Sequence, residues 1–160
     1  MKLIKHHGRA GVSWEGNAKT MKLPLPPDLE FHEDICLLIH RPRGLLNRVA
    51  INKLISVIGE LEFALKKPFN RFVDTVAADA VDLNLEYIRR VSLYRRRFYG
   101  NRPPIKTAIL ATDSTVADYV RLHASLTQGS PIEVRVFQDR TEAAQWLGVP
   151  LELLAAKPHR

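Results

Sequence analysis

From Leu29 onward, short apolar runs of strand length alternate with amphipathic helical segments, and this alternation constrains the fold more than any other feature of the chain. Residues 35–40 are a nearly unbroken apolar run, as is typical of an interior strand, and residues 105–112 are predicted to be another strand of the buried type. In residues 47–65, apolar residues instead recur every three or four positions, as in an amphipathic helix. Strands and helices that alternate in this way close by right-handed crossovers, which place successive strands parallel. The sequence therefore predicts an α/β fold.

The predicted order of elements is β-β-α-β-α-β-α-β-α, which gives a single mixed, mostly parallel β-sheet flanked by helices. The first two strands form a hairpin around a tight turn at Glu33-Asp34, and this hairpin adds an antiparallel member to the sheet. Asp113 or Ser114 caps the third helix, and Asp139 with Glu142 opens the fourth. We expect strands at 29–32, 35–40, 69–75, 105–112 and 132–137, and helices at 47–65, 84–99, 114–127 and 139–147.

The chain of 160 residues is long enough to bury one hydrophobic core. Residues 1–27 show no sustained period and end in a Pro-rich stretch, so we interpret them as a flexible N-terminal arm. Met21-Lys22-Leu23 repeats the opening Met1-Lys2-Leu3, which raises the hypothesis that translation begins at Met21. We expect the α/β domain to span 28–150, with 151–160 as a C-terminal tail.

Several classes of protein are disfavoured by missing features. The single cysteine, Cys36, excludes an intramolecular disulfide, and no apolar stretch is long enough for a membrane span, so we expect a cytoplasmic protein. No Gly-rich phosphate loop, nucleophile elbow or metal-binding His/Cys pattern is present, which predicts a non-catalytic protein without metal or cofactor. Cys36 should be a small hydrophobe inside its strand, and His123 a partly buried structural histidine.

Positive charge is concentrated in the helix at 84–99 and just after it. The net charge is +7, yet residues 89–106 hold seven basic residues and no acidic one. On a helical wheel, Tyr94 and Phe98 fall on the apolar side, where we expect them in the core. The opposite half is either a solvated face that pairs with acids such as Asp79 or Asp82, or a face that binds an anionic partner. Without exposed aromatic residues for stacking, nucleic acid is disfavoured as that partner. The candidate residues on this half are Arg89, Arg90, Arg96 and Arg97.

Two connections between elements carry the remaining candidate residues. Arg43 lies in an Arg-Pro-Arg-Gly turn between a strand and a helix, where ligands meet open α/β sheets, although a simple basic loop would look the same. A second hypothesis places Arg43 and Arg48 beside the loop 79–84, around a small anionic or amphipathic ligand. Asp82 and Asn84 in that loop are the types that cap helices.

The segment 134–147, Val-Arg-Val-Phe-Gln-Asp-Arg-Thr-Glu-Ala-Ala-Gln-Trp-Leu, resembles the C-terminal signature of the SpoIIAA-like branch of the STAS superfamily. The resemblance implies a compact mixed sheet flanked by helices and a non-catalytic regulatory or ligand-sensing role in a bacterium. Some members of the superfamily carry a phosphorylated Ser in the turn that leads into the second helix. The matching stretch here, residues 79–86, holds no Ser or Thr, so no phosphorylation site is carried over.

Two functions follow as alternatives. The first is a STAS-like regulatory module that binds a protein partner through its Arg-rich helix and the loop before it. The second is a module that binds a small lipid-like or amphipathic anionic ligand between the helices and the sheet. A solid core would favour the first, and an apolar cavity with converging polar groups the second. Self-association into a homodimer is a further hypothesis, through an edge strand or through the exposed side of the first helix at Phe63.

Overall fold

A computed structural model of the chain describes residues 24–158. Most of the predicted arm and the Met21 start site lie outside these residues. At the end of the arm, Leu25 packs against the hydrophobic cluster around Leu29, Leu38 and Ile58, so the packed structure begins before the predicted boundary at residue 28.

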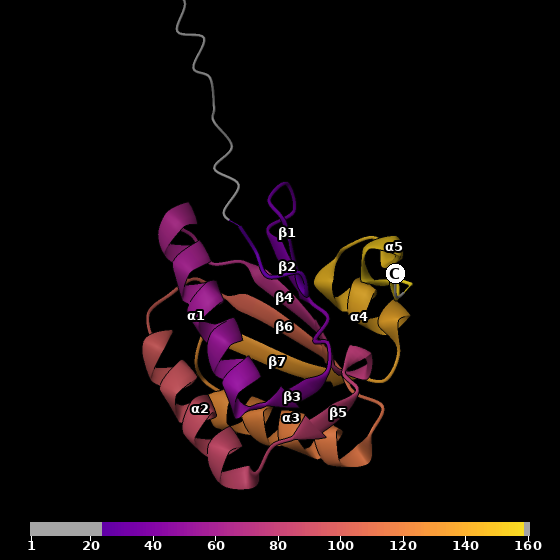
Figure 1. The fold of residues 1–160 in the computed structure, drawn as a ribbon. Coiled ribbons are helices and arrows are strands. Elements are labelled where there is room, and N and C mark those ends of the chain that lie inside the picture. Colours follow the sequence, from indigo (N-terminus) through magenta and orange to yellow (C-terminus); the bar gives the residue numbers. More distant parts are fainter. Residues whose placement is uncertain (1–23, 159–160) are drawn as a thin grey trace, which may run out of the picture.

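The core of the fold is a five-stranded sheet in the order β1-β2-β4-β6-β7 (Figure 1). Strand β1 pairs antiparallel with β2, and every other neighbouring pair is parallel. The predicted fold class, an α/β fold with one mixed and mostly parallel main sheet, is therefore confirmed. The strands are β1 (Leu29–His32), β2 (Leu37–His40), β4 (Asn70–Asp74), β6 (Ile105–Leu110) and β7 (Ile132–Phe137).

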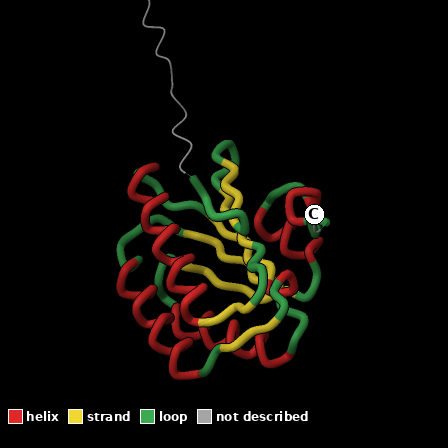
Figure 2. Tube along the Cα trace, viewed as in Figure 1, coloured by secondary structure: helices red, strands yellow, loops and turns green. Residues whose placement is uncertain are grey.

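Helices cover both faces of this sheet (Figures 1 and 2). The three long helices lie on one face and the two short ones on the other. Each strand contributes to both faces, since successive side chains of a strand point to opposite sides of the sheet. In β4, for example, Phe72 packs with the cluster beneath the short helices, while Arg71 and Val73 face the long ones. The helices are α1 (Arg48–Leu65), α2 (Leu85–Phe98), α3 (Ser114–Thr127), α4 (Arg140–Leu147) and α5 (Leu151–Leu154).

Side-chain caps fix where four of the helices begin. Asn47, Asn84, Asp113 and Asp139 each accept a hydrogen bond from a backbone N–H in the first turn of α1, α2, α3 and α4. The predicted capping role of Asn84 is confirmed. Asp82 does not cap the helix, because it ends a short strand and is exposed.

A second, two-stranded sheet was not predicted. Strand β3 (Leu45–Asn47) pairs in parallel with β5 (Ala80–Asp82), and a 3-10 turn, η1 (Thr75–Ala77), precedes β5. Both strands are three residues long, too short for an alternating pattern to be visible in the sequence. This small sheet joins the connections before α1 and α2 to each other.

Two other expectations differ from the structure. Residues 151–154 form α5 rather than the start of a tail: Leu154 is fully buried in the core, and Arg41 donates to the backbone oxygens of Leu153 and Ala155 (2.6 and 3.2 Å). Cys36 does not lie within a strand. It ends a four-residue turn with a φ of +50°, so the prediction that it is an interior strand residue is wrong.

None of the helices within residues 24–158 has the length and apolar character needed to cross a membrane. Over the same residues, no group of three or more His, Cys, Asp or Glu side chains is arranged to hold a metal ion.

Candidate functional site

An apolar cavity of about 150 Å³ lies between the sheet and the three long helices. Its walls come from β2, β4, β6 and β7 below and from α1, α2 and α3 above. Most of the lining side chains are aliphatic, such as Leu54, Val73, Ile88 and Ile109. A small set of polar side chains interrupts this apolar lining, namely His40, Arg71, Thr75, Arg95, Thr107, Tyr119 and His123.

Arg71 belongs to a buried network around a single carboxylate. Its Nη2 donates to Glu62 Oε1 (2.5 Å) and to the Tyr99 hydroxyl (2.9 Å), and that hydroxyl donates in turn to the Glu62 carboxylate (2.9 Å). Arg102, at the surface, donates to the same carboxylate (3.0 Å). Glu62 therefore already pairs with two guanidinium groups, while Nε and Nη1 of Arg71 are buried without a partner among residues 24–158.

Arg95 adds a second buried cation with no acid of its own. Only 7% of this residue is exposed, and among residues 24–158 its side chain forms no hydrogen bond or ion pair. Its guanidinium stacks on the Tyr99 ring (4.9 Å to the centroid), which Arg71 also contacts (5.3 Å). Burial, and then the charge of Arg71, lower the pKa of Arg95 to about 10, so it is still cationic at neutral pH. The cavity thus has an excess of buried positive charge at one end.

Two uncharged groups lie at the same end. Thr107 is the direct neighbour of Arg71 across the β4–β6 pair, and its buried hydroxyl has no partner in the described residues. His123 lies on α3, and its Nδ1 is 2.7 Å from the hydroxyl of Ser92 on α2. Burial, followed by the charges of Arg95 and then Arg71, lowers the pKa of His123 to about 4. The imidazole is therefore neutral at neutral pH.

His40 lines another part of the cavity wall. Its Nε2 is 3.1 Å from Asp28, and burial lowers its pKa although Asp28 acts in the opposite direction. Because that ring nitrogen is already engaged outside the cavity, His40 belongs to the anchoring of the hairpin.

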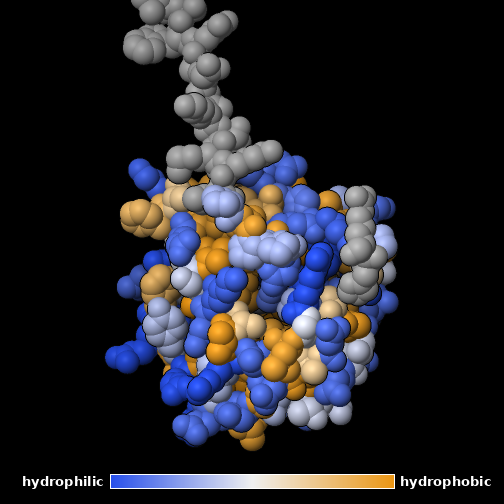
Figure 3. Space-filling model, viewed as in Figure 1, coloured by the Kyte–Doolittle hydropathy of each residue, from blue (hydrophilic) through white to orange (hydrophobic). Residues whose placement is uncertain are grey.

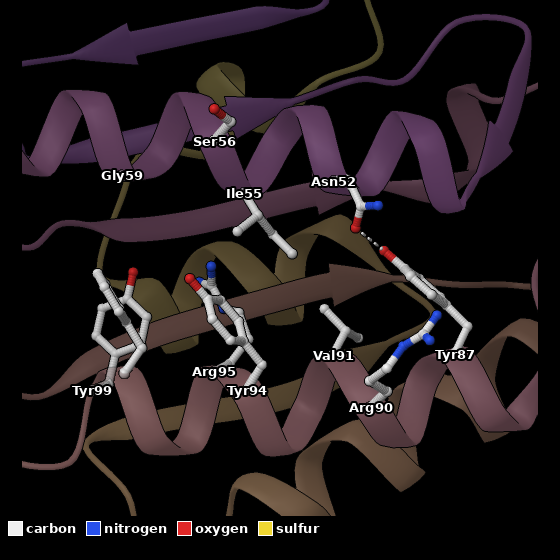
Figure 4. Close-up of a pocket in the computed structure, with 11 residues that line it drawn as sticks. Asn52, Ile55, Ser56, Gly59, Tyr87, Arg90, Val91, Tyr94, Arg95 and Tyr99 are labelled. Carbon is white, nitrogen blue, oxygen red and sulfur yellow. Dashed lines mark hydrogen bonds between the residues drawn. The ribbon is translucent and has the colours of Figure 1, made fainter.

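A groove of about 650 Å³ runs along the outside of the cavity, between α1 and α2 (Figure 4). Hydrogen bonds join the two helices at both ends of the groove: Tyr87 donates to Asn52 (2.8 Å), and Tyr99 to Glu62 (2.9 Å). Between these bridges, three residues border both the groove and the cavity and so lie where the two hollows adjoin. They are Ile55, Val91 and Arg95.

The chain matches no protein-family model, and no curated protein matches it. Among solved structures it is similar to an uncharacterised protein of the DUF3478 family, described as having a SpoIIAA-like fold, from Shewanella loihica PV-4. The TM-score is 0.50 and the sequence identity 19%, over 74% of this chain and 90% of that one. The fold is SpoIIAA-like. The expectation drawn from residues 134–147 is confirmed for the fold, and at this identity the similarity carries nothing further.

Within this SpoIIAA-like fold, the four predicted arginines of α2 are all exposed. Among residues 24–158 none of them forms an ion pair, so the expected pairing with Asp79 or Asp82 is absent. One of them, Arg90, borders the groove and lies over the Tyr87 ring (6.0 Å). A partner for this face stays a prediction. The four are Arg89, Arg90, Arg96 and Arg97.

The expectation that Tyr94 and Phe98 belong to the core is wrong. They are 54% and 43% exposed, stack on each other (6.1 Å between ring centroids) and line the groove. The surface over α1 and α2 accordingly mixes hydrophobic and hydrophilic residues (Figure 3). The reason is the orientation of α2, which turns Ser92 and Arg95 inward against α3 and the sheet.

The predicted loop residues lie outside the cavity. Arg43 is exposed at a separate hollow of about 170 Å³, which Asp74 and Arg140 also line. Arg48 is the exposed first residue of α1. Its helix and the loop 79–84 do lie side by side, because β3 pairs with β5. A ligand held between them stays a prediction.

Sequence reasoning missed Glu62, Arg71 and Arg95. Glu62 and Arg71 occupy positions that the periodic pattern assigns to the interior, whereas the burial of Arg95 depends on how α2 is oriented; a charged residue on an amphipathic element is ordinarily interpreted as solvated. The one available signal was Arg71, which points to the same side of its strand as Val73.

Proposed function

We propose that the chain is a binding module for a small amphipathic anion. The apolar body of the ligand occupies the cavity, and its anionic group pairs with Arg95 and Arg71. The observation that carries the proposal is a pair of guanidinium groups at one end of the cavity: Nε and Nη1 of Arg71 are buried without a partner among residues 24–158, and beside them Arg95, which is 7% exposed, forms no hydrogen bond or ion pair within the same residues. A desolvated cation is strongly unfavourable unless it is paired, so this end of the cavity favours an anion.

The shape of the hollow supports the same conclusion. A cavity of about 150 Å³ suits a body the size of a small ring or short alkyl chain. Only three side chains, Ile55, Val91 and Arg95, border both the cavity and the groove, and in this proposal the ligand enters past them. The sequence left two alternatives, a protein-binding module and a module for a small ligand. An apolar cavity with converging polar groups supports the second.

The test uses octanoate, an alkyl carboxylate, and octan-1-ol, its uncharged counterpart, titrated into the full chain by calorimetry. Octanoate should bind more tightly than octanol, because only octanoate supplies the missing negative charge. Arg95→Met keeps the length of the side chain and removes the charge, and it should weaken octanoate binding about tenfold or more, as expected for loss of a charge-assisted hydrogen bond.

The matched control is Arg97→Met, two positions along α2 on the exposed face. This variant should bind octanoate like the unmodified chain. Equal binding of octanoate by the Arg95→Met variant and the unmodified chain, or failure of octanoate to bind the unmodified chain, would overturn the proposed function.

A further inference from the structure

The outer side of α2 carries arginines and aromatic rings in alternation. Arg90, Tyr94 and Arg97 follow one another at four- and three-residue spacing, so they share one side of the helix. Phe98 lies one turn after Tyr94, and both rings line the groove beside α1, where Figure 4 shows Tyr94 and Arg90. Two further exposed arginines form a second row, one position away from Arg90 and Arg97. We call the whole set the arginine–aromatic surface: Arg89, Arg90, Tyr94, Arg96, Arg97 and Phe98.

This surface has an excess of positive charge. None of its four arginines forms an ion pair among residues 24–158, and Glu86 in the first turn is the one acidic residue within α2. In each row, the two arginines are seven residues apart, which is about 10 Å along the helix axis. Two rows of unpaired guanidinium groups favour an extended polyanion, such as a chain of phosphates, over a single small anion.

The two rings offer a place for a flat group to stack. Tyr94 and Phe98 lie nearly parallel, with 20° between the ring planes and 6.1 Å between the centroids. The guanidinium of Arg102 lies over Phe98 (4.2 Å to the centroid), whereas among residues 24–158 Phe98 is the one group that stacks on Tyr94. Because Tyr94 is 54% exposed, part of its ring surface is open to a ligand. From the sequence, nucleic acid is disfavoured because both rings were expected in the core, and their exposure removes that reason.

We propose that the arginine–aromatic surface binds single-stranded nucleic acid. An unpaired base stacks on Tyr94, and the arginines on either side pair with the neighbouring phosphates. Guanidinium groups bind phosphate in a bidentate way, and aromatic rings accept any base because every base has a flat face. A duplex keeps its bases stacked inside and would use the arginines alone. This inference does not rest on the proposed function, because the cavity group Arg95 is buried beneath this surface.

Other polyanions fit the surface less well. An acidic peptide would pair with the arginines but not with the ring faces, which carry partial negative charge. A membrane is entered by apolar side chains that protrude, whereas Tyr94 and Phe98 line a groove between two helices. A second copy of the same surface would bring arginines against arginines.

The experiment measures binding of a fluorescein-labelled twelve-nucleotide oligouridylate to the full chain by fluorescence anisotropy over a series of salt concentrations. Binding should weaken steadily as the salt concentration rises, because phosphate pairing releases counterions. Unlabelled oligouridylate should compete at least tenfold better than polyphosphate or polyglutamate of equal charge, because only oligouridylate has bases. Oligothymidylate of the same length distinguishes the two polymers: tighter binding of one identifies it as the preferred strand, and similar binding means that the surface accepts both.

Tyr94→Leu tests the stacking. This variant keeps an apolar side chain but loses the ring, so its affinity for oligouridylate should fall about tenfold. Tyr94→Phe keeps the ring and should bind like the unmodified chain. Phe63→Leu is the matched control, since Phe63 is 87% exposed but lies on α1, outside the rows of arginines, and it should also leave binding unchanged.

Arg90→Gln and Arg97→Gln test the phosphate contacts. Each should reduce the slope of log affinity against log salt concentration by about 0.7, the value expected for one lost phosphate contact on a single strand. Arg121→Gln is the matched control: Arg121 is exposed on α3, where it already pairs with Asp118 (2.8 Å), and its loss should leave the slope unchanged. All these side chains are exposed, so the variants should fold like the unmodified chain.

Four outcomes would overturn the inference: no binding of oligouridylate at low salt, equal binding by Tyr94→Leu and Tyr94→Phe, competition by polyglutamate or polyphosphate as strong as that by oligouridylate, or binding that is lost in Arg95→Met and kept in Tyr94→Leu. Strong competition by polyglutamate would indicate an acidic protein partner instead. The last outcome would place the nucleic acid at the cavity. The proposed function is tested separately by octanoate binding.

Discussion

On the side of the sheet covered by α4 and α5, aliphatic and aromatic side chains pack into one cluster, in which Leu37, Ile39, Phe72 and Leu154 are all fully buried. On the side covered by α1, α2 and α3, the same strands border a cavity and carry Arg71 and Thr107. The two faces are built from alternate residues of the same strands, so neither β propensity nor strand length accounts for the difference.

We expect the packed face to contribute mainly to stability and the cavity face mainly to the proposed binding. Close packing of apolar groups gives the first face its stabilising contribution, since each fully buried side chain contributes through both lost water contact and dispersion. On the second face, the cavity reduces this stabilising contribution, and guanidinium groups that are buried there without a full set of partners lower the free energy of unfolding. A mutation on one face should therefore change a different property from a mutation on the other.

The largest effect is expected for Phe72→Ala on the packed face. The lost side chain leaves a void that α4 cannot refill, so the free energy of unfolding should fall by about 3–5 kcal/mol. Val73→Ala, the adjacent residue on the cavity face, should lower it by roughly 1 kcal/mol, because its side chain already borders empty space. Urea unfolding of both variants measures the difference, and equal losses would contradict the contrast between the faces.

The second prediction concerns pH and the cavity face. The pKa of His123 is about 4 in the folded chain against an ordinary value of 6.5, so the unfolded chain binds more protons between these values. The stability due to neutral His123 is then full above pH 6.5 and is lost as the pH falls toward 4. Between pH 7 and pH 4.5 this loss should be roughly 2–3 kcal/mol.

Comparison with the His123→Asn variant isolates this effect, because the carboxylates and His40 titrate in both proteins. Urea unfolding at pH 7 and pH 4.5 should show a smaller loss in the variant. An identical loss in the two proteins would show that His123 is not the group responsible.

A third prediction concerns α5, which contributes Leu154 to the packed face. Leu154→Ala should lower the free energy of unfolding by about 2 kcal/mol, near the lower end for such a truncation because a four-residue helix can shift to fill the space. Glu152→Ala, on the exposed side of α5, is the control and should change little. A Leu154 variant as stable as the unmodified chain would place α5 outside the cooperative core.

The smallest effect is expected on the outer surface of α2. Arg89→Ser and Arg96→Ser should each change the free energy of unfolding by less than about 0.5 kcal/mol and leave octanoate binding unchanged, because both residues are exposed and form no ion pair within the described part of the chain. Loss of octanoate binding in either variant would mean that the anion site extends onto this face.

The helix α2 shows which features can be predicted from local sequence. Its start at Asn84 and its amphipathic period were predictable, because a cap and a hydrophobic repeat act within one or two turns. The side of the helix that faces inward was not predictable, since it depends on the elements that pack against α2. Ser92 bonds to His123 on α3, and this orientation buries Arg95 while Tyr94 and Phe98 turn outward.

The sequence by itself determined the order of the main strands and helices and the antiparallel hairpin, because caps, turns and apolar periods are local and the crossover rule fixes how they assemble. The SpoIIAA-like fold was implied by the resemblance of residues 134–147, and the similar solved structure confirms it. Only the tertiary structure decided the site. Glu62, Arg71, Arg95 and His123 come from four different elements, and their burial depends on how three helices pack over one sheet. A charge that looks solvated in the sequence becomes a candidate binding group once such packing removes it from water.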